Sequence, residues 1–227
     1  MDISAAQLKW IFIDVFVLII SISLHEFGHA FMATRLGDDT PARQGRVTLN
    51  PIAHIDPVGT LLLPILGGLF AAAGAPVGGF GWGKPVQWQP HRIRRGINMS
   101  TAKILVAIAG PLMNALLACV VALTHGILMH FKVLSSGSDL NLVLYFAVAT
   151  NFILMFFNLL PLPPLDGGHV AEQFVPYKHR DKFHEVAKYA PFVILGIMLI
   201  PKVQQVFLIP AIWCTEHVYR AVLALFS

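Results

Sequence analysis

Long apolar runs separated by short polar connections dominate the chain. Three of these runs, at about residues 8–35, 104–129 and 140–160, are long enough to cross a bilayer, whose hydrocarbon core needs ~20 residues of apolar helix. Two further runs, at 189–200 and 203–225, close the chain and are divided at Pro201-Lys202. The pattern predicts an all-α polytopic membrane protein with a three-helix core. The C-terminal runs predict two additional transmembrane helices, or one kinked helix in their place.

The apolar run at residues 58–80 differs from the others because glycine and proline interrupt it repeatedly. Irregular backbone at membrane depth must be shielded from lipid by protein, so this composition favours a re-entrant hairpin over an ordinary short span. The polar stretch before it, residues 37–57, contains Gly45-Arg46-Val47-Thr48-Leu49, whose brief alternation allows a short β element.

The composition supports a membrane protein with one domain. Hydrophobic residues make up 56% of the chain and charged residues 12%, whereas soluble domains carry about 25% charged residues. We expect a single membrane-embedded domain over residues 1–227, with a core at about 8–170 and C-terminal helices at about 186–225. The net charge of +4 comes from basic residues that cluster between apolar runs, where they determine topology, so no nucleic-acid partner is expected. Cys119 and Cys214 lie in apolar segments and indicate neither a disulfide framework nor a cysteine-bound metal.

The first apolar run contains His25-Glu26-Phe27-Gly28-His29, a His-Glu-x-x-His motif. Two histidines four residues apart lie on one face of a helix, so both rings can reach one zinc ion, and Glu26 can act as general base on a metal-bound water. An ionisable group inside a span costs roughly 2.5–3.5 kcal/mol and is usually functional. The motif therefore predicts a metal site more strongly here than it would on a soluble helix.

The charge distribution predicts where a third ligand lies. The connection at residues 84–103 carries Lys84, Arg92, Arg94, Arg95 and Lys103 with no acidic residue, which places it in the cytoplasm. The next run then leads outward and the run at 140–160 returns, so Asp166 lies at the cytoplasmic side. If 58–80 is re-entrant, His25 and His29 lie at that same depth, and a full span there would separate them from Asp166.

Asp166 follows a helix-breaking segment that contains Pro161, Pro163 and Pro164. Gly167-Gly168 allows the backbone to turn sharply behind it, so the carboxylate can project sideways. A plain turn is the alternative interpretation, but the shared depth favours a His/His/Asp zinc site with one open position.

Three separated motifs resemble the site-2 protease family of intramembrane zinc metalloproteases (peptidase family M50). They are His25-Glu26-Phe27-Gly28-His29, Gly110-Pro111-x-x-Asn114 and Asn158-x-x-Pro161-x-x-x-Leu165-Asp166-Gly167. Phe80-Gly81-Trp82-Gly83-Lys84-Pro85 and Asn50-Pro51-x-x-His54-x-Asp56-Pro57 are similar to its compact bacterial and archaeal branch. The resemblance covers about residues 8–190, and no stretch is long enough for a PDZ or CBS domain.

The resemblance implies an intramembrane zinc metalloendopeptidase that acts on transmembrane protein substrates in the bilayer of a prokaryotic cell membrane, with its active site toward the cytoplasm. His25, His29 and Asp166 would bind one zinc ion and Glu26 would be the base. Asn158 would position the substrate or the transition state. The element that contains Gly78, Gly79, Phe80 and Gly81 would present an edge to the substrate.

Other residues and functions remain open at this point. His169 follows Asp166 by three residues and is a candidate to orient its carboxylate. His54, in a proline-bounded loop, is expected to be structural or gating rather than a ligand. A metal-ion transporter is an alternative function, but it requires further polar ligands on neighbouring spans. A catalytically silent homologue that binds membrane helices is another, against which the intact Glu26 argues.

Overall fold

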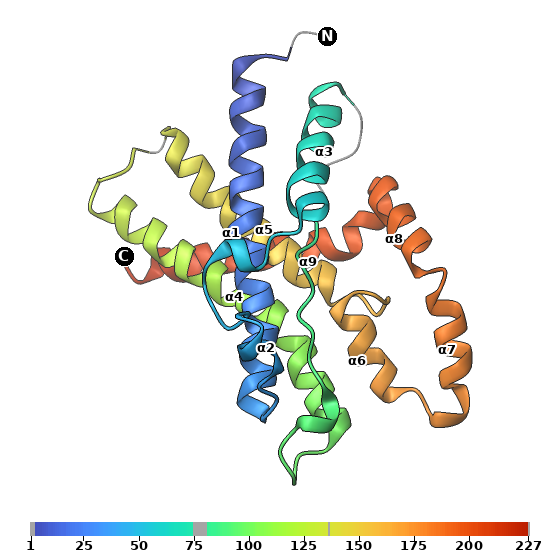
Figure 1. Ribbon diagram of the computed structural model, residues 1–227. Helices are drawn as coiled ribbons and strands as arrows, with labels where there is room; N and C mark the ends of the chain where they lie inside the picture. Colours follow the sequence, from blue (N-terminus) through green and yellow to red (C-terminus); the bar gives the residue numbers. More distant parts are fainter. Residues whose placement is uncertain (1–2, 75–80, 136, 227) are drawn as a thin grey trace.

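The computed structural model describes residues 3–74, 81–135 and 137–226, and these residues are mostly helical (Figure 1). Within these ranges, four helices have the length and apolar composition to cross a membrane: α1 (Ala5–Leu36), α4 (Met99–His130), α5 (Asp139–Asn158) and α9 (Pro201–Ala224). The predicted all-α polytopic membrane fold is confirmed.

Shorter helical segments connect these four. They are α2 (Thr40–Arg43), η1 (Pro51–Ala53), η2 (Pro57–Leu62), α3 (Leu63–Ala72), η3 (Pro90–Arg92), α6 (Asp166–Phe174), η4 (Tyr177–His179), α7 (Arg180–Ala187) and α8 (Ala190–Leu199).

Helix α1 has well-defined signals at both ends. Ser4 accepts a hydrogen bond from the Gln7 amide, and the Gln7 side chain in turn accepts one from the Ser4 amide, which together satisfy two N-terminal donors. Gly37 ends the helix at φ 118°, a left-handed conformation that favours glycine. The helix that carries the His-Glu-x-x-His motif is thus defined by local sequence at each end.

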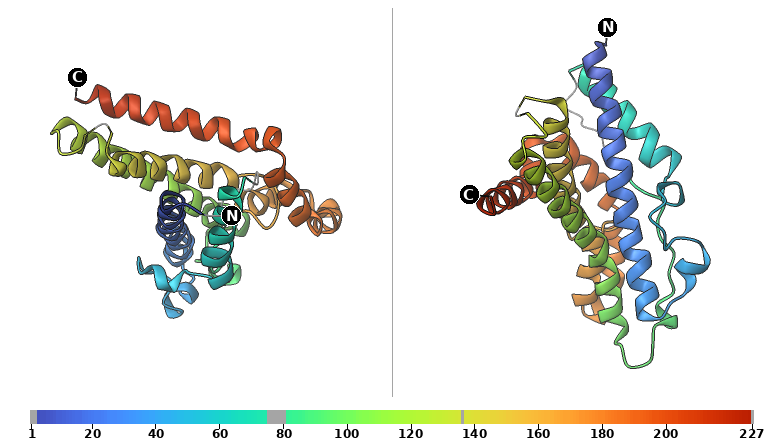
Figure 2. Two further views of the ribbon diagram at one scale, coloured as in Figure 1. Left: turned by 90° about the horizontal axis from the view of Figure 1, so that it is seen from above. Right: turned by 90° about the vertical axis from the view of Figure 1, so that its left-hand side faces the viewer.

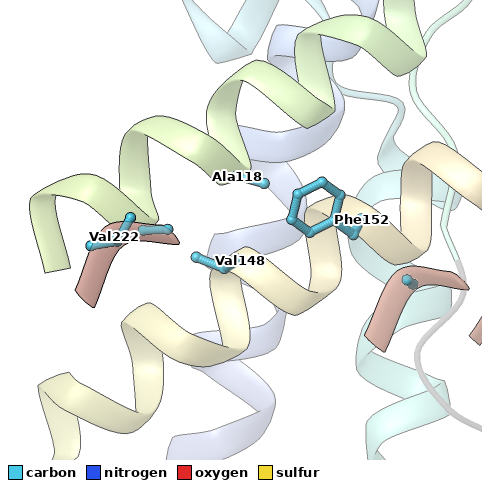
Figure 3. Close-up of a cluster of buried hydrophobic side chains, with 6 residues drawn as sticks. Ala118, Val148, Phe152 and Val222 are labelled. Carbon is cyan, nitrogen blue, oxygen red and sulfur yellow. The ribbon is translucent and has the colours of Figure 1, made fainter. Parts of the chain in front are cut away.

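Helices α4, α5 and α9 lie side by side and run across α1 (Figure 2). Between them pack Ala118 of α4, Val148 and Phe152 of α5 and Val222 of α9, all buried (Figure 3). Ala122 and Ala211 join the same cluster with no exposed surface. Because lipid is as apolar as these side chains, helix association depends on close packing, and small residues let the helices approach.

The segment from Pro57 to Lys84 is an excursion along α1 that ends close to where it begins. Its outgoing arm is η2 and α3, and its returning arm is the chain from Gly81 to Lys84. Elements η2 and α3 run beside the N-terminal half of α1, and the chain then comes back (Figure 1). On its return, the Trp82 amide donates to the Gly59 carbonyl at 3.2 Å and the Lys84 amide donates to the His54 carbonyl at 2.9 Å. A full span would have its ends at opposite faces of the membrane, so this path agrees with the hairpin alternative.

Two expectations need qualification. The prediction of a short β element at residues 45–49 was wrong: Gly45 lies in a turn, residues 47–49 form bends, and the described part of the chain contains no strand. The reason is that the Thr48 carbonyl accepts from the His54 ring at 2.9 Å, and no second strand lies beside the segment. The C-terminal runs form two helices, as predicted, but α8 has 10 residues, too few for the ~20 that a span needs, so of the two only α9 has the length to cross a membrane.

Candidate metal centre

The structure brings His25, His29 and Asp166 together. The two histidines lie one turn apart on α1, with their Nε2 atoms separated by 3.1 Å. Asp166, the first residue of α6, places Oδ2 3.1 Å from His25 Nε2 and Oδ1 3.3 Å from His29 Nε2. The three side chains form the one group of potential metal ligands among the described residues.

The far nitrogen of each imidazole is held by helix α4. His25 Nδ1 lies 2.7 Å from Asn114 Oδ1, and His29 Nδ1 lies 2.7 Å from the Val106 carbonyl oxygen. Both partners are acceptors, so each Nδ1 carries the proton and donates. Each Nε2 therefore directs a lone pair toward Asp166, which is the tautomer that a metal ligand requires.

A second layer of hydrogen bonds fixes the Asn114 amide. Its Nδ2 donates to the Ser21 carbonyl at 3.1 Å and to Asn151 Oδ1 at 2.9 Å, which leaves Oδ1 to face His25. Asn151 also donates to the Ser21 hydroxyl at 2.9 Å. Asn114 and Asn151 have almost no exposed surface, so this network links α1, α4 and α5 in the interior.

The donor set fits a zinc ion. Two imidazole lone pairs and a carboxylate converge, three acceptors that a divalent cation would satisfy together. Ligands at 2.0–2.1 Å from zinc in tetrahedral geometry lie about 3.3 Å apart, close to the separations of 3.1 and 3.3 Å found here. Three protein ligands also leave a fourth position for water or substrate.

Gly110 of α4 makes room for the ligands. A Cβ atom built at this position would lie 2.4 Å from His29 Nε2 and 2.7 Å from His25 Nε2. Any side chain here would occupy the space between the histidines and α4, so the close approach requires glycine.

The neighbouring residues Gly167 and Gly168 act differently from the sharp turn that the sequence suggested. Both lie in the first turn of α6 and pack against the preceding backbone, where a Cβ on Gly167 would lie 2.2 Å from the Leu159 carbonyl oxygen. They bring the start of α6 close to the end of α5, and this packing sets the position of Asp166.

The metal centre lies in a cavity of about 1120 Å³. Its mostly apolar walls come from α1, α3, α4, α5, α6, α8, α9 and the returning chain at residues 81–90. Glu26, Asn158 and His169 also line it. Of the predicted substrate edge, Gly81 lines the cavity, whereas Gly78, Gly79 and Phe80 lie outside the described residues.

Asn158 and His169 share the cavity without bonding to the ligands. The Asn158 amide donates to the Leu154 carbonyl of its own helix at 2.9 Å. The contacts of the Asp166 carboxylate are with His25 and His29. The roles suggested for Asn158 and His169 stay predictions.

Three contacts of the site were not predicted from sequence: the bond of His25 to Asn114, which the motif comparison named without a role, the bond of His29 to the Val106 carbonyl, and the approach of Arg46 Nη2 to within 3.9 Å of Glu26 Oε2. Gly110 and Asn114 are four residues apart and therefore share one helical face. That spacing could have indicated a face of α4 turned toward the histidines. Nothing in the local pattern around Arg46 indicated burial.

Comparison with known proteins agrees with this geometry. The sequence pattern of Peptidase family M50 matches residues 13–200. A Bacillus subtilis (strain 168) protein named zinc metalloprotease YwhC is 38% identical over 192 residues, which cover 82% of this chain and 80% of the relative. A Mycolicibacterium smegmatis protein named zinc metalloprotease Rip2 is 31% identical over 219 residues, 92% of this chain and 74% of the relative.

The Rip2 protein of Mycobacterium tuberculosis (strain ATCC 25618 / H37Rv) is 30% identical over 196 residues, 82% of this chain and 68% of that protein. No solved structure matches the chain. With a family match over most of its length and a metal-ligand group at the motif, the chain belongs to peptidase family M50 and is a zinc metalloprotease.

Proposed function

We propose that this metalloprotease hydrolyses peptide bonds in or near the transmembrane segments of membrane proteins. The observation that carries the proposal is the location of His25, Glu26, His29 and Asp166 in an apolar cavity bounded by helices long enough to cross a bilayer. A cavity with such walls suits an apolar substrate segment better than a soluble peptide.

In the proposed mechanism, His25, His29 and Asp166 hold one zinc ion per chain. Zinc, when bound, polarises the scissile carbonyl and lowers the pKa of a water molecule. Glu26 takes a proton from the attacking water and delivers it to the leaving amine. An amide carries two N–H donors, so Asn158 keeps one for the substrate while the other bonds to Leu154.

A transmembrane substrate must unwind to expose its carbonyl, and its freed backbone groups then need partners that lipid lacks. The returning chain can supply them. The backbone amides of Trp82 and Lys84 are already bonded: they donate to the carbonyls of Gly59 and His54, where the excursion begins. Alternate residues of an extended chain direct their backbone groups to opposite sides, so the proposed pairing with the substrate uses the backbone groups of Gly83, between these two residues.

We propose that Gly83, together with Gly78, Gly79, Phe80 and Gly81, forms the edge on which the substrate pairs by strand addition.

The orientation in the membrane follows from charge. The basic connection at residues 84–103 is tied to the C-terminal end of α1, where the Arg94 amide donates to the Leu36 carbonyl at 3.0 Å. His25 and His29 lie in that half of α1. We therefore propose, by the positive-inside rule, that the active site faces the cytoplasm. A prokaryotic cell membrane is what the resemblance to the compact branch of the family implies.

The alternative function of metal-ion transport predicts further ligand groups along a path. Within residues 3–74, 81–135 and 137–226, His25, His29 and Asp166 form the one such group. Zinc flux through vesicles that contain the purified protein, without proteolysis, would favour transport.

A comparison of membrane proteomes from cells with the wild-type protein and with Glu26→Gln tests the proposal. We expect uncleaved transmembrane precursors to accumulate in the variant cells. Identical membrane proteomes, with both proteins expressed and substrate present, would contradict it.

A further inference from the structure

Arg46 is buried beside the active site. Among the described residues it is the one buried lysine or arginine, with 5% of its surface exposed. It lies in the loop between α2 and η1, not in a membrane-crossing helix. Arginine is almost never fully buried unless it is paired, so its partners are informative.

The guanidinium bridges the two ends of the 57–84 excursion. Nη1 donates to the Ala53 carbonyl, in η1 just before the excursion begins, and Nη2 donates to the Lys84 carbonyl, where the excursion ends. Arg46 thus joins η1 to the chain that we propose as the substrate edge.

Two carbonyls are neutral, and the counter-charge for Arg46 comes from Glu26. Oε2 of Glu26 lies 3.9 Å from Arg46 Nη2, and the two side chains are 12% and 6% exposed. A buried charge without a partner is strongly destabilising, so this pairing matters to both groups. The distance is too long for a hydrogen bond, and the carboxylate oxygens stay available for proton transfer.

His54 is not the charged partner of Arg46. Its side chain is fully buried, and burial together with the charge of Arg46 lowers the pKa of His54. A neutral imidazole leaves the Glu26 carboxylate as the charge that faces the guanidinium.

The returning arm also passes close to Glu26, with no room for a side chain between them. A Cβ built on Gly83 would lie 3.0 Å from Glu26 Cγ and 3.2 Å from Glu26 Oε1. Glu26, Arg46 and the chain at Gly83-Lys84 therefore form one packed unit.

We propose that Arg46 is a positioning residue for peptide hydrolysis: it fixes the Glu26 carboxylate relative to the returning arm. The base is thereby held at a constant position relative to a peptide paired on that arm. The inference rests on the proposed function of the site. Arg46 need not touch the substrate, because it acts through Glu26 and through the Lys84 carbonyl.

The test compares Arg46→Lys and Arg46→Gln with the same two substitutions at Arg43. Arg43 is a matched control, since it lies three residues before Arg46, at the end of α2, with its side chain 68% exposed and paired with Asp39. Each purified protein is assayed for zinc content, thermal unfolding, and kcat and KM on a transmembrane peptide in detergent.

We expect kcat to fall about 10–100-fold in Arg46→Gln, the size typical of residues that orient a metal site, with KM and zinc content unchanged. Arg46→Lys keeps the charge but cannot reach both carbonyls in the same way, so its kcat should lie between wild type and Arg46→Gln. The Arg43 variants should match wild type.

Wild-type kcat per zinc-loaded, folded molecule in both Arg46 variants would overturn the proposal, even if their yield or unfolding temperature falls. A rise in KM at constant kcat would also overturn it. Absence of cleavage by wild type and the Arg43 variants would instead contradict the proposed function itself.

Discussion

Asn114 on α4 accepts a hydrogen bond of 2.7 Å from the imidazole of His25 on α1. Because its own Nδ2 is committed to Ser21 and Asn151, the Asn114 amide cannot rotate to offer a donor instead. The tautomer of a metal-facing histidine is therefore set by a network that spans three helices.

Asn114→Ala should weaken zinc binding. The substitution leaves His25 free to rotate and removes the acceptor that fixes its tautomer, and loss of such a partner typically costs 10–100-fold in metal affinity. Competition with a chromogenic chelator measures the effect. Asn141→Ala is the matched control, since Asn141 bonds to the ring of His125 in another part of α4 and α5. Equal zinc affinities in all three proteins would show that the network does not serve the metal.

Gly110→Ala should displace the ligands while preserving the helix. The new methyl group would lie 2.4 Å from His29 Nε2, whereas alanine is itself a better helix former than glycine. We expect a folded protein with greatly reduced zinc content, measured by elemental analysis alongside circular dichroism. Gly196→Ala is the control, because a Cβ there meets nothing within 4 Å. A full complement of zinc in Gly110→Ala would refute the packing argument.

The buried His54 should make the protein less stable in mild acid. Burial and Arg46 lower the pKa of His54 in the folded state, so the unfolded chain binds this proton more readily. Its stabilising contribution is fully present above the unfolded pKa of about 6.5 and is lost as the pH falls below that value, by at most about 1.4 kcal/mol per pH unit for one proton.

Unfolding of wild type and His54→Gln between pH 5 and pH 7 checks this, because glutamine can still donate to the Thr48 carbonyl but does not titrate. The variant should show the flatter pH profile. His91→Gln, at an exposed position in η3, should retain the wild-type slope. A wild-type slope in His54→Gln would assign the pH dependence to other groups.

The parts of the site that depend on local spacing could be predicted from sequence. His25 and His29 face the same way because a helix repeats every 3.6 residues. Asp166 could be placed with them because charge asymmetry fixes the depth of each apolar run. The return of the chain to Gly59 followed from glycine and proline content at membrane depth.

The parts that depend on contacts between distant segments could not be predicted. The alternation around Arg46 suggested a strand, but Arg46 is buried against two carbonyls more than five residues away, and Thr48 bonds to a histidine ring. A single sequence gives no sign that a loop arginine faces Glu26. Likewise, Gly167-Gly168 looked like a turn because the packing of α6 against the end of α5 is not visible in local sequence.

The most direct test of the account is cleavage of a transmembrane peptide by purified protein in proteoliposomes, with products mapped by mass spectrometry. Wild type should cut within or at the border of the apolar segment. Glu26→Gln should bind one zinc per chain and lose activity by about 10²–10⁴-fold, the contribution of a general base. Undiminished cleavage by Glu26→Gln, or cleavage by wild type only in segments remote from the membrane, would contradict the account.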